Sequence, residues 1–172
     1  MKKIILIGSG GAGKSTLARR LGESLQINVY HLDAIFWKPN WIGTPKDEQI
    51  AIQKNLIKRE TWIIDGNYGS TMEMRMEAAD TIIFLDLPRR ICLYRAFKRS
   101  LQYRNKKRPD MGEGCKERLS FTFFKWIWDF PKTQKPIILN HLTHLSTKKG
   151  VMILKSPKDI EKFLEKMTLI ND

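Results

Sequence analysis

Between residues 8 and 15 the chain reads Gly8-Ser9-Gly10-Gly11-Ala12-Gly13-Lys14-Ser15. This stretch fits the pattern G-x-x-x-x-G-K-[S/T] of a phosphate-binding loop. Because glycine has no Cβ, the backbone can wrap tightly and direct successive N–H groups at a polyphosphate. In such a loop the lysine ammonium, here Lys14, can reach the terminal phosphates, and the Ser15 hydroxyl can ligate Mg²⁺.

The residues on either side of the loop suit this interpretation. Residues 3–7 form an apolar, β-branched run that is typical of a buried parallel strand, and residues 14–25 have the apolar spacing of a helix. A helix that starts in the loop adds the positive end of its dipole to the anion site. An ordinary glycine turn between strand and helix is the alternative. It is disfavoured because the sequence matches every fixed position of the motif. We therefore expect ATP contacts at Gly8, Ser9, Gly10, Gly11, Ala12, Gly13, Lys14, Ser15 and Thr16.

The rest of the chain alternates between strand and helix patterns. Further strands are expected at 29–32, 61–64, 81–85 and 151–154, and helices at 47–60, from 88 onward, at 114–130 and at 157–167. Residues 105–114 are basic and then rich in glycine and proline, which favours a flexible segment. The alternation predicts an α/β fold with a mainly parallel sheet, and 172 residues suit a single domain over 1–172.

Composition limits the class of protein. No apolar run approaches the ~20 residues needed to cross a bilayer, so we expect no membrane partner. A strand pattern begins almost at the N-terminus and leaves no room for a signal peptide. The two cysteines, Cys92 and Cys115, follow no metal-ligand pattern. These observations predict a cytoplasmic protein with reduced thiols.

The net charge of +13 is large and its excess is concentrated. Residues 89–108 contain nine lysines and arginines and no carboxylate. Such a run can be a solvated helix face followed by a basic loop, or it can bind anions. Since a cationic surface attracts phosphates, its coexistence with a phosphate-binding loop favours anion contacts for some of these arginines.

Three further motifs resemble a known family. They are His31-Leu32-Asp33-Ala34 with Trp37 and Trp41 nearby, the run from Trp62 through Asp65-Gly66-Asn67-Tyr68, and Arg108-Pro109-Asp110 followed by Glu113-Gly114-Cys115. Over nearly its whole length the chain resembles the adenylate-kinase-like group of small phosphate-loop kinases, and more narrowly the bacterial proteins labelled DNA topology modulation proteins. The resemblance implies a P-loop NTPase fold of three α/β/α layers with a five-stranded parallel sheet. It also implies an acceptor-binding region at about 33–60 and a lid-like region at about 95–130.

The same resemblance suggests roles for several residues. Asp86-Leu87-Pro88, followed by Arg95 and Arg99, is similar to the adenylate kinase stretch that leads into the lid. Carried over, Arg95 would cover the base and Arg99 would contact phosphates, as a planar guanidinium can do both. Arg118 would be a further lid arginine, and Ser156 would lie where the backbone meets the adenine edge. Asn67-Tyr68-Gly69 departs from the family, since adenylate kinases have Phe-Pro-Arg there and use that arginine to grip a nucleotide acceptor.

Two carboxylates are candidate catalytic residues. Asp65 ends a predicted central strand, where it can hold Mg²⁺ together with Ser15 or can cap a turn before Gly66. Asp33 can accept a proton from an acceptor hydroxyl or can cap a helix. Phe36, Trp37 and Trp41 can stack on a ring-bearing substrate or pack in the core, whereas the three histidines lack metal spacing.

These features predict an ATP- and Mg²⁺-dependent phosphotransferase that acts on a small-molecule phosphate acceptor, either a nucleotide or a hydroxylated metabolite. The missing arginine after Gly66 favours the hydroxylated acceptor. A nucleotide-dependent DNA-binding regulator is an alternative that the net charge supports. A third possibility is a nucleotide-binding protein that has lost turnover. The sequence leaves the oligomeric state open.

Overall fold

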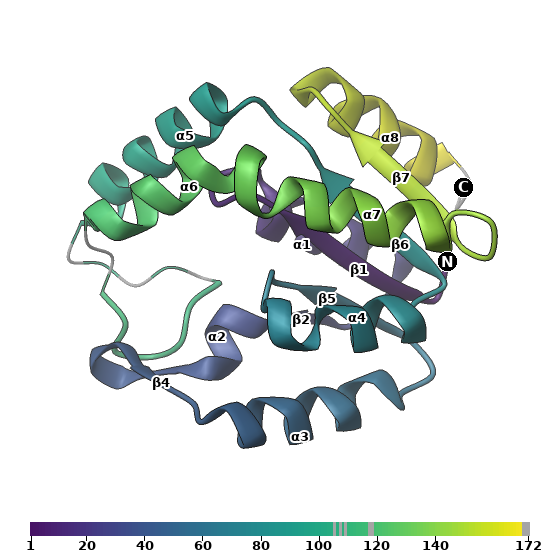
Figure 1. Cartoon of the computed structure of the whole chain (residues 1–172), viewed down its shortest axis with the longest axis horizontal. Helices are drawn as coiled ribbons and strands as arrows, with labels where there is room; N and C mark the ends of the chain where they lie inside the picture. The colour runs from purple at the N-terminus through teal and green to yellow at the C-terminus, as the bar shows by residue number, and fades with distance from the viewer. Residues whose placement is uncertain (105, 107, 109, 117–118, 170–172) are drawn as a thin grey trace.

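The computed structural model describes residues 1–104, 106, 108, 110–116 and 119–169. Its centre is a five-stranded sheet with the strand order β2-β5-β1-β6-β7, in which every neighbouring pair is parallel (Figure 1). The strands are β1 (Lys3–Gly8), β2 (Val29–His31), β5 (Trp62–Asp65), β6 (Thr81–Leu85) and β7 (Gly150–Leu154). The predicted α/β fold with a five-stranded parallel sheet is therefore confirmed.

Helices cover both faces of the sheet. Along β1, Ile4 and Leu6 belong to one apolar cluster with α1 (Lys14–Leu25) and α8 (Pro157–Leu169). Ile5 and Ile7 belong to a second cluster on the opposite face, with side chains from α3 (Lys46–Ile57), α4 (Gly69–Ala78) and α7 (Lys135–Leu145). Successive strand residues point to opposite faces, so a continuous apolar run such as Ile4–Ile7 is what a sheet covered on both sides requires.

Two helices lie side by side along one end of the molecule, α5 (Arg89–Gln102) and α6 (Phe121–Thr133) (Figure 1). The predicted helix over 114–130 is wrong at its start, because α6 begins at Phe121. The Ser120 hydroxyl accepts a hydrogen bond from the Phe123 N–H at 3.3 Å and caps the helix. Gly114 has φ +72°, a left-handed conformation that does not continue a helix.

The region between β2 and α3 contains short elements that the sequence did not predict. They are α2 (Leu32–Phe36), the single turn η1 (Pro39–Trp41), and a two-stranded hairpin of β3 (Trp37–Lys38) and β4 (Ile42–Gly43). Asp33 lies within the first turn of α2, whose N-cap residue is His31. The interpretation of Asp33 as a helix cap is therefore wrong. In the described part of the chain no helix has the length and apolar character needed to cross a bilayer.

The sheet brings the candidate residues to one edge. His31 pairs in register with Asp65, and Leu6, two residues before the phosphate loop, pairs with Asp65 on the other side. The carboxyl ends of parallel strands meet at one edge, where open α/β sheets bind ligands. The loop after β1, α2 after β2, and the turn after β5 are therefore neighbours.

Candidate active site

The phosphate loop has the geometry that its motif predicts. Gly13 is in a left-handed conformation at φ 99°, and α1 begins at the next residue, Lys14. The Lys14 ammonium folds back over the loop and donates to the carbonyl oxygens of Gly8 and Ser9, at 2.9 and 3.0 Å. The N–H groups of the first helical turn have no partners within the helix and are suited to bind an anion.

Helices α5 and α6 fix the loop from outside. A Cβ at Gly11 (φ +75°) would collide with the carbonyl oxygen of Cys92 on α5. A Cβ at Gly10 would lie 2.5 Å from Cζ of Phe123 on α6. These two glycines are therefore required by close packing as well as by the phosphate-binding conformation.

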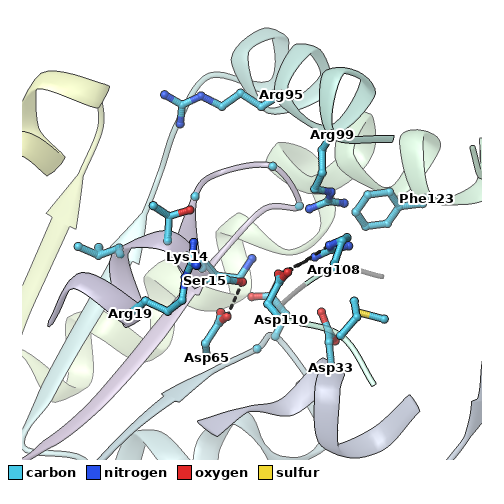
Figure 2. Close-up of a pocket in the computed structure, with 18 of the residues that line it drawn as sticks. Lys14, Ser15, Arg19, Asp33, Asp65, Arg95, Arg99, Arg108, Asp110 and Phe123 are labelled. Carbon is cyan, nitrogen blue, oxygen red and sulfur yellow. Dashed lines mark hydrogen bonds and ion pairs between the residues drawn. The ribbon is translucent and has the colours of Figure 1, made fainter. Parts of the chain in front are cut away.

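Asp65 connects the loop to the neighbouring strands. Its Oδ2 accepts a hydrogen bond from the Ser15 hydroxyl at 2.7 Å and lies 3.0 Å from His31 Nδ1 (Figure 2). Its Oδ1 is buried and has no hydrogen-bond partner among the described residues. A buried carboxylate oxygen without a partner, close to a hydroxyl, fits a site for a divalent cation or its water.

The cation site would be completed by a ligand. Among the described residues no three His, Cys, Asp or Glu side chains are arranged to hold a metal ion. Mg²⁺ commonly takes one or two protein oxygens and completes its shell with phosphate and water oxygens. Ser15 and Asp65 therefore fit an Mg²⁺–nucleotide complex rather than a metal bound by protein alone.

Asn67 holds the start of the phosphate loop. Its Nδ2 donates to the Gly8 carbonyl at 2.6 Å, and its Oδ1 accepts from the Gly8 N–H at 3.1 Å. Sequence reasoning noted Asn67 within a family motif and as a departure from the adenylate kinase pattern, but gave it no role. In the structure this side chain binds both backbone groups of Gly8 and ties β5 to the loop.

Arg75 is a buried cation that sequence reasoning missed. The side chain is fully buried, and its guanidinium donates to the carbonyl oxygens of Gly66 (2.7 Å), Tyr68 (3.1 Å) and Thr71 (3.4 Å). Burial lowers the pKa of Arg75 to about 10, which still leaves it charged at neutral pH. Arg75 thus fixes the backbone of the turn that carries Asn67 and Tyr68.

A hydrogen bond from Tyr68 orients Asp33. The Tyr68 hydroxyl donates to Asp33 Oδ1 at 2.9 Å, and the Tyr68 ring packs against Phe36 with 4.9 Å between the ring centroids. The Asp33 side chain is exposed to solvent through the mouth of the cleft, but the walls of the cleft enclose it and reduce its hydration. Desolvation, and secondly the charge of Asp65, raise the pKa of Asp33, against opposing contributions from Tyr68, Lys14 and Arg108. Its Oδ2 has no hydrogen-bond partner within the described ranges.

Arg108 and Asp110 form a second pair of charges in the site, which sequence reasoning named in a family motif but did not include among the candidate site residues. Arg108 Nη2 lies 2.6 Å from Asp110 Oδ2, and Arg108 Nε donates to Asp110 Oδ1 at 3.2 Å (Figure 2). Burial of Asp110 is outweighed by Arg108 and by the nearby polar Ser15 hydroxyl, which together lower the pKa of Asp110 to about 2.

Residues 110–116 pack against the hairpin region. A Cβ at Gly112 would collide with the Trp37 carbonyl oxygen, and the Cys115 thiol donates to the Lys38 carbonyl at 3.1 Å. The Trp41 indole N–H donates to the Lys116 carbonyl at 3.0 Å. Residues 110–114, which belong to the segment 105–114 that was expected to be flexible, are therefore docked on residues 34–41.

These groups surround one cleft of about 1080 Å³. Arg95 lines it and its Nη1 lies 3.5 Å from the Ala12 carbonyl, whereas the Arg99 guanidinium lies 5.7 Å from the centre of the Phe123 ring. The loop contributes Gly10, Gly11, Gly13, Lys14, Ser15 and Thr16 to the lining, and Asp33 and Asp65 also line it.

One sequence-predicted residue, Ser156, does not line the cleft, although its neighbour Pro157 does. The Ser156 hydroxyl instead accepts from the Asp159 N–H at 3.1 Å and caps α8. Arg118 lies outside the described residues.

Comparisons with known proteins agree with the fold. Residues 1–58 match the family described as PduV-EutP, ethanolamine utilisation – propanediol utilisation. No curated protein is significantly similar to the chain. Shikimate kinase from Acinetobacter baumannii in complex with shikimate is a structural neighbour, with a TM-score of 0.66 and 15% sequence identity over 99% of this chain and 92% of that chain. The chain thus shares its overall fold with this kinase, and the narrower resemblance to DNA topology modulation proteins is not confirmed.

Proposed function

We propose that this chain is an ATP-dependent phosphotransferase whose acceptor is a small molecule with a hydroxyl group. The observation that carries the proposal is that Lys14, Ser15 and Asp33 line the same cleft. A phosphate-binding loop alone would suit any nucleotide-binding protein. A carboxylate beside it, with one oxygen that has no hydrogen-bond partner among the described residues, suits group transfer to a second ligand.

The donor end of the cleft is formed by the loop. Bound ATP–Mg²⁺ would supply the phosphoryl group and neutralise the charge that develops during its transfer. Ser15 and Asp65 are the residues that would hold the cation, and the loop N–H groups with Lys14 would hold the phosphates. Arg95 and Arg99 on α5 would close over the transferred group and exclude water, with Arg118 as a further candidate.

Asp33 is the proposed proton acceptor. Tyr68 occupies Oδ1 and fixes the orientation of the carboxylate, so Oδ2 is the atom that would take the hydroxyl proton. The raised pKa of Asp33 makes it a stronger base than an ordinary aspartate. The structural neighbour is a kinase captured with the small molecule shikimate, which supports a small acceptor.

Lys14→Ala tests the donor end. We expect loss of ADP release by a factor of about 10³, comparable with the removal of other phosphate-binding cations, while circular dichroism and thermal unfolding stay near wild type. Wild-type protein would be screened against nucleosides, nucleotides and sugars. Retained turnover in the variant would contradict the site. Binding of ATP–Mg²⁺ by wild type without turnover on any acceptor would favour a protein that has lost catalysis.

A second candidate, binding to nucleic acid, is favoured by the outer face of α5. Arg90, Tyr94, Phe97, Lys98 and Leu101 are exposed there with helical spacing, and α5 contains no acidic residue. Cations with exposed aromatic rings suit phosphates and stacked bases. Filter binding of single-stranded DNA at two salt concentrations tests this, and a Lys98→Glu variant should weaken any retention. No retention at low salt would exclude this candidate.

A further inference from the structure

The acceptor end of the cleft is lined by aromatic side chains. Trp37, Trp41 and Tyr68 all line it and all are half-buried. The rings of Trp37 and Trp41 are 5.7 Å apart between centroids at an interplanar angle of 62°. Each is held by its surroundings, because the Trp41 indole N–H donates to the Lys116 carbonyl and the Trp37 carbonyl accepts from the Cys115 thiol at 3.7 Å. Fixed aromatic faces of this kind suit a flat ring.

Among the described residues, the same end offers no excess positive charge. The walls here are residues 33–41 and the described part of 108–116, and the only cation they contribute to the cleft lining is Arg108. Arg108 is 6% exposed and is engaged by Asp110 through two contacts. Asp33 adds a further carboxylate, so these lining residues carry one positive and two negative charges. An anionic group on the acceptor would meet net repulsion at this wall.

We propose that the acceptor is an uncharged alcohol that carries a flat ring, such as a nucleoside, and is neither a nucleoside monophosphate nor a carboxylate. This inference rests on the proposed function and narrows its acceptor. The hydroxyl oxygen forms the new bond to the γ-phosphorus of ATP. The bond from that phosphorus to the bridging oxygen breaks, and its electron pair leaves with ADP. The hydroxyl proton passes to Asp33.

Binding of matched pairs tests the proposal. Adenosine, guanosine, cytidine, uridine and thymidine would each be titrated against the matching 5′-monophosphate. Benzyl alcohol and benzoate would form a ring pair without a sugar. Calorimetry in the presence of a non-hydrolysable ATP analogue and Mg²⁺ gives the affinities. We expect an uncharged member to bind at least tenfold more tightly than its anionic counterpart. Tighter binding of the anionic members, or no binding by any uncharged member, would overturn the proposal.

A charge substitution sharpens the test. Asp110→Asn removes the carboxylate that balances Arg108, so the preference for the uncharged member should fall by about tenfold or more. Because the quantity compared is a ratio of two acceptors, an effect of Asp110 on Ser15 and the nucleotide cancels. Glu48→Gln is the matched control, since Glu48 pairs with Lys38 at 3.6 Å, and neither residue lines the cleft as described. An equal change in both variants would reject a local role for Asp110.

The ring contact is tested separately. Trp41→Leu keeps an apolar side chain but removes the aromatic face, and it should weaken nucleoside binding without weakening binding of the ATP analogue alone. Unchanged nucleoside affinity would contradict the aromatic contact. Failure of the inference is distinguishable from failure of the proposed function. In the first case ATP–Mg²⁺ binds and only anionic acceptors are phosphorylated, and in the second case ATP–Mg²⁺ does not bind.

Discussion

Ser15 Oγ lies 2.7 Å from Asp65 Oδ2, although 50 residues separate the two in the sequence. The hydroxyl belongs to the loop after β1, and the carboxylate ends the neighbouring strand β5. The pairing positions two oxygen atoms beside the loop, where the proposed Mg²⁺–nucleotide complex would bind. It also explains why Asp65 remains buried, at 5% exposure, in a site where its Oδ1 has no protein partner among the described residues.

Asp65→Asn should weaken the use of Mg²⁺. An amide keeps an oxygen but removes the negative charge, so we expect turnover to fall by about 10- to 100-fold and the Mg²⁺ concentration for half-maximal rate to rise. Asp86→Asn is the control. Asp86 also follows a central strand, but it pairs with Lys135 at 2.8 Å and is absent from the described cleft lining. The same Mg²⁺ dependence in both variants would contradict the assignment of Asp65.

Asp33→Asn should increase stability and reduce activity. The raised pKa of Asp33 means that the folded protein binds its proton more tightly than the unfolded chain does. This contribution to stability is complete below the unfolded pKa and is lost as the pH rises through the folded pKa. In thermal unfolding, the Asp33→Asn variant should therefore be more stable than wild type at pH 7 and equally stable near pH 3. Turnover should fall by about 10²- to 10⁴-fold. Full turnover would exclude Asp33 as the base.

Gly11→Ala should destabilise the fold. The new methyl group would meet the Cys92 carbonyl, and φ +75° is unfavourable for alanine. Together these effects should lower the free energy of unfolding by about 2–4 kcal/mol. Gly69→Ala is a matched control, because no atom lies within 4 Å of the added Cβ and the residue begins α4. That change should be neutral or stabilising by up to about 1 kcal/mol. Urea denaturation of both variants measures the difference.

Arg75→Leu should affect the acceptor end through the backbone. The change leaves the Gly66 and Tyr68 carbonyls without their donors, at a cost of about 2–4 kcal/mol of stability. The Tyr68 hydrogen bond lowers the pKa of Asp33, so a displaced Tyr68 should move the acidic limb of the rate profile to higher pH. Arg75→Lys should shift it less. A stability loss with no shift in the profile would make Arg75 a purely structural residue.

Local signals predicted the phosphate loop and the carboxylate beside it, whereas tertiary contacts position the residues of the proposed acceptor end. The loop motif, the apolar run of β1 and the Asp-Gly after β5 each carry their information within a few residues. His31 became recognisable as a partner of Asp65 only through the register of β2 with β5. Arg75 donates to three backbone carbonyls, and no sequence pattern predicts these contacts. Asp110 lies near Ser15, 95 residues earlier in the sequence, because residues 110–116 dock on the hairpin of β3 and β4. Each of these strands has only two residues, too few for a recognisable strand pattern.

The Gly8 carbonyl has two donors, Lys14 Nζ at 2.9 Å and Asn67 Nδ2 at 2.6 Å. If the Lys14 ammonium moves from the loop to a phosphate, the Gly8 carbonyl keeps its hydrogen bond from the Asn67 side chain. Only the Ser9 carbonyl then loses the hydrogen bond that Lys14 donated. The hydrogen bonds lost from the loop are therefore nearly balanced by those formed to the phosphate. The Lys14 ammonium would therefore already lie beside the bound phosphates. Moving it from the loop carbonyls to a phosphate would reduce the free energy of nucleotide binding only slightly.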